Sequence, residues 1–165
     1  GSTITMQVAR NFFLSRDKLI GRKLNEVALA YKIEGALSKD EILELYMNQI
    51  YLGQRAYGFG SASKIYFGKS LGDLSIAEMA MLAGLPQNPA RHNPVVNPKG
   101  ARARQHVVLK SMRELDYITE AQYQKALTDI FHSPATLGAR PKRRISSEAS
   151  AVISVICSAV GSRFT

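Results

Sequence analysis

Charged residues near the start of the chain have the types and spacing that could hold an anionic group. Lys18, Arg22 and Glu26 are four residues apart, so on one continuous helix they share a face, and Arg10 precedes Lys18 by eight residues. Two or three cations beside one carboxylate can cradle a diphosphate, and Lys23 is a further cation in this stretch. By spacing alone, the same residues also fit a solvated helix face with an Arg22–Glu26 pair contributing about 0.3–0.5 kcal/mol.

Hydroxyl and amide side chains precede this charged stretch. Ser2, Thr3, Thr5 and Gln7 can form a turn and helix cap, or they can line a polar binding cleft. The residue types alone leave both interpretations open.

Composition indicates an anionic partner without identifying it. Lysine and arginine number 22 against 13 acidic residues, a formal net charge of +9 over 165 residues. Nucleic acid, an anionic membrane and a phosphorylated substrate all reward such charge. The single cysteine, Cys157, leaves the redox compartment open, the three histidines lack metal-ligand spacing, and no apolar run reaches the roughly 20 residues that span a bilayer.

The elements that position these residues are expected to be helices. Three capping boxes predict helix starts, at Ser38 with Glu41, Ser75 with Glu78 and Thr119 with Gln122. A further helix is predicted over 19–36, with an apolar face formed by Leu24, Val27, Ala28 and Tyr31. Four prolines in 86–100 predict an ordered loop between helices. The length and these signals together predict one mainly α domain.

The last thirty residues differ in composition from the rest. A basic cluster at 140–144 precedes a stretch rich in serine, alanine and valine, in which 152–156 would suit a short strand. We predict a domain over 1–132 and a linker or divergent tail over 133–165.

Four sequence blocks carry a resemblance to a known family. They are GSTITMQ at 1–7, RKLNE at 22–26, KDEILELYMN at 39–48 and RQHVVLKSM at 104–112. In this order they resemble the conserved motifs of the family 51 peptidoglycan glycosyltransferases, most closely the glycosyltransferase module of class A penicillin-binding proteins. The resemblance covers roughly residues 1 to 130. The family's first motif, which carries the glutamate acting as general base, lies upstream of the first of these blocks, and we expect the chain to lack it.

The resemblance implies a fold, a reaction and a site. The fold would be the larger, C-terminal part of a lysozyme-like, mainly helical domain. The reaction would join lipid II units into glycan strands with inversion, releasing undecaprenyl diphosphate. Glu26 would be the catalytic residue of this chain, with Arg10, Lys18 and Arg22 at the diphosphate. The cleft would be lined by Ser2, Thr3, Thr5 and Gln7, with Met6 standing where the family usually has a glutamine.

The resemblance also implies partners and a location. Lipid II, the growing glycan strand, the membrane surface and cell-wall synthesis proteins would be partners, with no nucleic acid, at the periplasmic face of a bacterial inner membrane and with any anchor outside this chain. Nothing in the sequence demands a cofactor, although in some members magnesium assists at the substrate diphosphate. Without the general base, worth about 10² to 10⁴ in rate, we expect the chain alone to be impaired.

Two other classes of protein remain as alternatives. One is a basic, helical nucleic-acid-binding domain, although no helix-turn-helix or RNA-binding signature is visible. The other is a non-catalytic scaffold piece of a cell-wall complex. S-x-x-K patterns at 15–18 and 61–64 lack the partner motifs of a penicillin-reactive serine, and the Gly68-Lys69-Ser70 triplet lacks the earlier glycine of a phosphate-binding loop.

Overall fold

The chain folds into helices throughout the part that the structure describes. The computed structural model describes residues 3–13 and 21–129. In chain order its helices are α1 (Ile4–Phe13), α2 (Gly21–Ala36), α3 (Lys39–Gln49), α4 (Phe59–Phe67), the 3₁₀ turn η1 (Leu71–Asp73), α5 (Ile76–Gly84), the 3₁₀ turn η2 (Leu85–Gln87), α6 (Pro98–Glu114) and α7 (Glu120–Thr128). Within these residues the only extended pairing is an isolated antiparallel bridge between Tyr51 and Tyr57. The prediction of a mainly α fold is confirmed.

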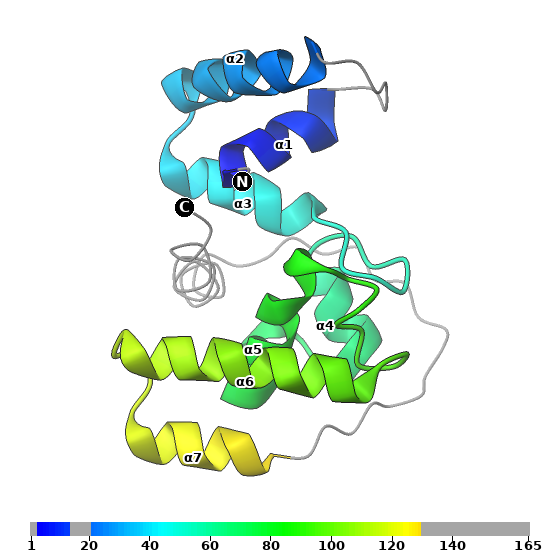
Figure 1. Cartoon of the computed structure of the whole chain (residues 1–165), viewed down its shortest axis with the longest axis vertical. Helices are drawn as coiled ribbons and strands as arrows, with labels where there is room; N and C mark the ends of the chain where they lie inside the picture. The colour runs from blue at the N-terminus through cyan, green and yellow to red at the C-terminus, as the bar shows by residue number, and fades with distance from the viewer. Residues whose placement is uncertain (1–2, 14–20, 130–165) are drawn as a thin grey trace.

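The helices form two packed groups that share one connecting region. In Figure 1, α1, α2 and α3 lie together at one end, and α5, α6 and α7 lie at the other, with α4 beside α5. One hydrophobic core gathers side chains from α1 to α5, including Val8, Met47 and Tyr66. A second core joins α5, α6 and α7 around Leu109 and Met112. Because α5 contributes to both cores, it links the two groups.

The predicted capping boxes set three helix starts. Ser38, Ser75 and Thr119 each accept a hydrogen bond from the backbone N–H three residues on, and the side chain of that later residue accepts one from the backbone N–H of the cap. These bonds satisfy helix donors that would otherwise lack partners. A fourth cap, Asn97 at the start of α6, precedes a proline at the first helical position, where proline is tolerated.

The helix predicted over 19–36 is present as α2, but the predicted face was wrong. Leu24, Val27 and Tyr31 are 73%, 51% and 81% exposed, whereas Ala30 and Ile33 are buried. The buried face of α2 is set by its contact with α1 and α3, and it includes a charged side chain, Glu26, that a hydrophobicity pattern cannot select.

Loops between the helices are ordered by their own polar contacts. The proline-rich stretch 86–100 is a loop between helices as predicted, apart from η2 at its start and α6 from Pro98. Asn88 Oδ1 accepts from the Arg91 N–H at 3.0 Å, and Asn93 Oδ1 accepts from the N–H of Val95 at 2.9 Å. The predicted short strand over 152–156 and the basic cluster at 140–144 lie outside the described residues, and the predicted boundary at 132 stays a prediction.

Candidate active site

A buried carboxylate with two cationic neighbours forms the centre of the candidate site. Glu26 on α2 is 1% exposed. Its Oε1 lies 3.1 Å from Nε of Arg10, and its Oε2 accepts a hydrogen bond from Nζ of Lys23 at 3.0 Å. The two cations are 42% and 54% exposed in their side chains, so each has one side on the carboxylate and another toward solvent.

The α1–α2 pair positions this cluster. Two contacts show that the helices run antiparallel: Thr5 near the start of α1 bonds Glu34 near the end of α2, and Arg10 near the end of α1 pairs with Glu26. In Figure 1 these helices lie side by side above α3. Burying an ionised Glu26 without partners would cost much free energy. The two cations are therefore required to keep the buried carboxylate ionised.

The hydroxyl-rich start of the chain makes structural contacts. Its residue types had allowed either a helix cap or a polar binding cleft. Thr3 caps α1, because its Oγ1 accepts a hydrogen bond from the N–H of Met6 at 3.2 Å. Thr5 is 7% exposed, and its Oγ1 donates to Oε1 of Glu34 at 2.6 Å. Gln7 is half-buried on α1. The position of Thr5 between helices makes it a link between α1 and α2, whereas its predicted role in lining the cleft stays a prediction.

Three of the predicted site residues are not placed by the structure. Ser2 and Lys18 lie outside the described residues, and for Arg22 the backbone at the start of α2 is described without its side chain. The structure brings Lys23 onto Glu26. The i, i+3 spacing of these two residues on a helix is the sequence signal for this contact, which the i, i+4 pattern of Arg22 and Glu26 does not include.

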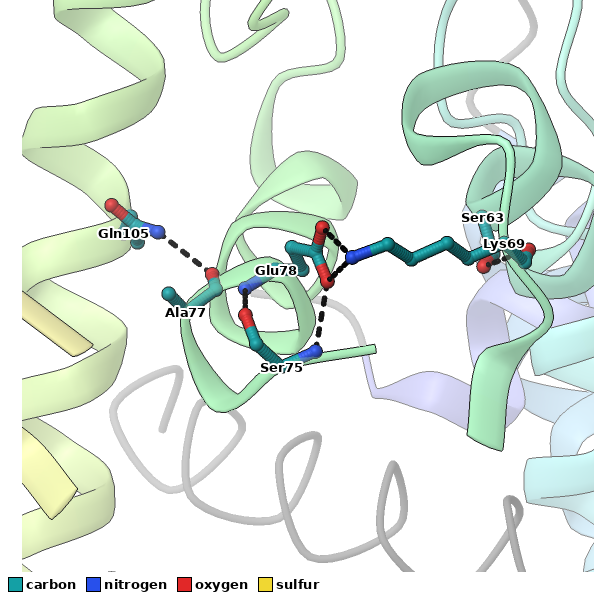
Figure 2. A network of polar contacts seen from close by, with 6 residues as sticks. All are labelled: Ser63, Lys69, Ser75, Ala77, Glu78 and Gln105. Atoms are coloured by element: carbon teal, nitrogen blue, oxygen red, sulfur yellow. Dashed lines mark hydrogen bonds and ion pairs between the residues drawn. The ribbon is translucent and has the colours of Figure 1, made fainter. Parts of the chain in front are cut away.

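A separate polar network joins the end of α4 to α5 and involves the motifs set aside in the sequence. Figure 2 shows Lys69 reaching Glu78, with its Nζ 2.8 Å from Oε1, while Ser63 Oγ donates to the Lys69 carbonyl at 2.8 Å. Lys64 Nζ donates to the hydroxyl of Ser70. Lys64 of the S-x-x-K pattern at 61–64, and Lys69 and Ser70 of the Gly-Lys-Ser triplet, are thus engaged in contacts within the protein, and Lys69 connects the segment after α4 to α5.

The same figure shows how α6 is attached to α5. Gln105, 2% exposed on α6, donates from Nε2 to the Ala77 carbonyl at 2.7 Å. The motif that contains Arg104 and Met112 therefore lies in scaffold: Met112 is 4% exposed in the second core, and burial lowers the pKa of the half-buried Arg104.

The described part of the chain has neither a cluster of metal ligands nor a membrane-spanning helix. Among residues 3–13 and 21–129, no three histidine, cysteine or acidic side chains converge as ligands for a metal ion. None of the helices in that same part of the chain is both long and apolar enough to cross a bilayer.

These features define a helical domain in which the first two helices hold a buried carboxylate between cations. A family model described as "Transglycosylase" matches residues 1–113. The chain belongs to this transglycosylase family, the glycosyltransferase family 51 that its motifs predicted.

Relatives and a solved structure agree with this membership. Over 131 residues the chain is 60% identical to penicillin-binding protein 1A of Neisseria gonorrhoeae, a match that covers 79% of this chain and 16% of the relative. It is 62% identical over 128 residues to a putative transglycosylase of Cupriavidus necator, covering 78% of this chain and 55% of that protein. The crystal structure of penicillin-binding protein 1A from Haemophilus influenzae is similar with a TM-score of 0.56 at 32% identity, over 79% of this chain and 16% of that one.

The chain spans about one sixth of the length of the penicillin-binding proteins that it matches. Its helical domain is of the transglycosylase type found in peptidoglycan glycosyltransferases related to penicillin-binding protein 1A.

Proposed function

We propose that this domain binds the diphosphate of lipid II and contributes to polymerising lipid II into glycan strands. The observation that carries the proposal is the buried Glu26 held between Arg10 and Lys23. Lys23 and Glu26 belong to the family block at 22–26, and Arg10 follows the block at 1–7. The family membership supports the reaction, and the charge arrangement supports the part that this chain plays in it.

The geometry suits a leaving diphosphate. Arg10 and Lys23 are anchored on Glu26 yet about half exposed, so the solvent-facing side of each cation can meet phosphate oxygens without a large rearrangement. Preorganised cations of this kind stabilise negative charge as it develops on the leaving group. Glu26 is then the residue that fixes and partly neutralises the two cations, and Lys18 and Arg22 are proposed as further diphosphate contacts.

Inversion at the donor sugar follows from direct attack by the acceptor hydroxyl. The proton of the attacking hydroxyl goes to the glutamate of the family's first motif, which acts as general base. The diphosphate leaves with its charge facing Arg10 and Lys23. We expect the 165-residue chain to be impaired in the absence of that base.

A divalent metal has no protein ligand set among the described residues. Glu26, the acidic residue at the site, is already engaged with two cations. Magnesium, where it takes part, would be held by the diphosphate oxygens.

The remaining partners are proposed from family membership. They are the growing glycan strand, the membrane surface and other cell-wall synthesis proteins, at the periplasmic face of the inner membrane. The net positive charge of the whole chain suits a surface with anionic lipids.

Gel-resolved polymerisation of fluorescent lipid II tests the proposal. The 165-residue chain, the same chain preceded by the family's first-motif segment, and the Glu26→Gln variant of the longer form would be compared. We expect glycan strands from the longer form alone, with a loss of at least about 100-fold in Glu26→Gln.

A matched control is Glu44→Gln, which removes an exposed carboxylate from α3 and should leave polymerisation unchanged. Absence of strands from the longer form, with circular dichroism showing it folded, would contradict the proposed function.

A further inference from the structure

The placement of α1 depends on contacts with its neighbours. The helix has ten residues, fewer than the roughly 12–15 at which an isolated helix becomes even marginally stable in water. Its start is capped by Thr3, and its apolar side chains Val8 and Ala9 are buried in the first core. Apolar packing alone fixes an axial position weakly, whereas directional polar contacts can fix it closely.

Two polar contacts attach opposite ends of α1 to the same partner helix. At one end the Thr5 hydroxyl donates to Glu34 at 2.6 Å, and at the other Arg10 pairs with Glu26 at 3.1 Å. Glu34 follows Glu26 by eight residues, about 12 Å along α2 at the helical rise of roughly 1.5 Å per residue. Two attachment points this far apart oppose both sliding and rotation of α1 on α2.

The Thr5–Glu34 contact is of the stronger kind. Its acceptor is a carboxylate, and hydrogen bonds to ionised groups are shorter and stronger than those between neutral groups. Thr5 is almost fully buried while Glu34 is exposed, so a loss of Glu34 leaves the Thr5 hydroxyl without this acceptor.

We propose that Glu34 is a positioning residue: through its hydrogen bond with Thr5 it fixes α1 against α2 and thereby holds Arg10 beside Glu26. The role of Arg10 in binding a diphosphate rests on the proposed function, whereas the geometric coupling between the two contacts does not. Glu34 acts on the site through Thr5 and touches no reacting group.

A purely electrostatic role of Glu34 and a positioning role predict opposite effects of Glu34→Ala on anion binding, so the two roles can be distinguished. Removing a negative charge near a cationic site strengthens anion binding by a simple charge effect, whether Glu34 is replaced by alanine or by glutamine. Positioning predicts weaker binding for Glu34→Ala. It predicts little change for Glu34→Gln, because the amide oxygen can still accept from Thr5.

The test uses the 165-residue chain with inorganic pyrophosphate as the probe. Calorimetry gives its dissociation constant, and the Nε–H signal of Arg10 in ¹H–¹⁵N spectra, assigned with Arg10→Lys, reports on the ion pair. We expect Thr5→Val and Glu34→Ala to weaken pyrophosphate binding by about threefold to tenfold and to shift the Arg10 signal. Thr5→Ser, Glu34→Gln and the exposed-site control Glu44→Ala should each stay within about twofold.

Each other outcome has a defined meaning. Tighter binding in both Glu34 variants, or an unchanged Arg10 signal in folded Thr5→Val, overturns the positioning role. If the unaltered chain does not bind pyrophosphate, the proposed diphosphate site fails, and the Arg10 signal still decides the coupling: a shift in Thr5→Val and Glu34→Ala supports it, and no shift overturns it.

Discussion

At the scale of single residues, Glu26 combines burial with charge. Its carboxylate is 1% exposed but contacts two cations that remain about half exposed. A carboxylate so placed serves the site because its partners are held in position before any ligand arrives. Its contribution to the free energy of unfolding is smaller, since the desolvation of a buried ion offsets much of its attraction to the partners.

Replacing Glu26 by glutamine should therefore lower the free energy of unfolding by only about 1–2 kcal/mol, less than the roughly 3–5 kcal/mol expected for a fully buried pair. Arg10 and Lys23 can rehydrate after the change, which limits the cost. Urea denaturation followed by circular dichroism measures it, with Glu44→Gln as the exposed control. An unchanged midpoint would contradict this prediction and would mean that the desolvation of Glu26 fully offsets its attraction to the two cations.

At the scale of elements, the loop between α3 and α4 has an unusual backbone. Gly53, Gln54 and Arg55 all have positive φ, at 84°, 47° and 60°. Tyr66 holds this loop by donating its hydroxyl hydrogen to the Leu52 carbonyl at 2.8 Å. A Cβ on Gly53 would lie 2.7 Å from that hydroxyl oxygen, so glycine is required there by space as well as by φ.

Arg55 adopts the left-handed conformation without being glycine, which costs roughly 1–2 kcal/mol. Arg55→Gly should relieve this strain and raise the free energy of unfolding by about 0.5–1 kcal/mol, the remainder being offset by the greater entropy of glycine in the unfolded chain. The thermal midpoint would be compared with that of Gly53→Ala, for which we expect a decrease. A fall in the midpoint of Arg55→Gly would mean that its side chain contributes more than the backbone strain costs.

The loop before α6 contains a partly buried histidine. Burial is the main cause that lowers the pKa of His92 below its ordinary 6.5; the nearby Arg104 and Arg91 lower it further, and a hydrogen bond with the Gly100 backbone opposes them. Below about pH 6.5 the unfolded chain binds a proton at this histidine that the folded chain does not. The contribution of His92 to stability is therefore present above pH 6.5 and is lost as the pH falls from 6.5 toward the lowered pKa.

Urea unfolding at pH 5 and pH 7.5 checks this sign. We expect the loss of stability at pH 5 to be smaller in His92→Gln than in the unaltered chain. His106→Gln, at an exposed position on α6, is the matched control and should keep the full pH dependence. An equal pH dependence in all three proteins would contradict the assignment to His92.

At the scale of the whole molecule, the two cores are joined by α5. Ala77, Ala80 and Ala83 face the second core, while Met81 and Leu82 of the same helix belong to the first. Because α5 packs in both cores, unfolding of one core removes packing contacts from the other. We infer that the described domain unfolds as one cooperative unit.

Met112→Ala tests this coupling from the second core. The side chain is 4% exposed, so its truncation should lower the free energy of unfolding by about 2–4 kcal/mol. Circular dichroism should give one transition that coincides with loss of the amide signals of α1 and α3 in ¹H–¹⁵N spectra. Persistence of those signals after α6 has unfolded would show two independent units.

The sequence by itself determined the helical class, the family and several helix starts. Capping boxes such as Ser38 with Glu41 are formed by residues three apart, so their geometry follows from local sequence. The tertiary structure alone decided which face of α2 is buried, that Arg10 of α1 pairs with Glu26, and that Thr5 bonds Glu34. Those outcomes depend on how α1 packs against α2, and a contact between residues 29 positions apart is set by that packing and has no local signal in the chain.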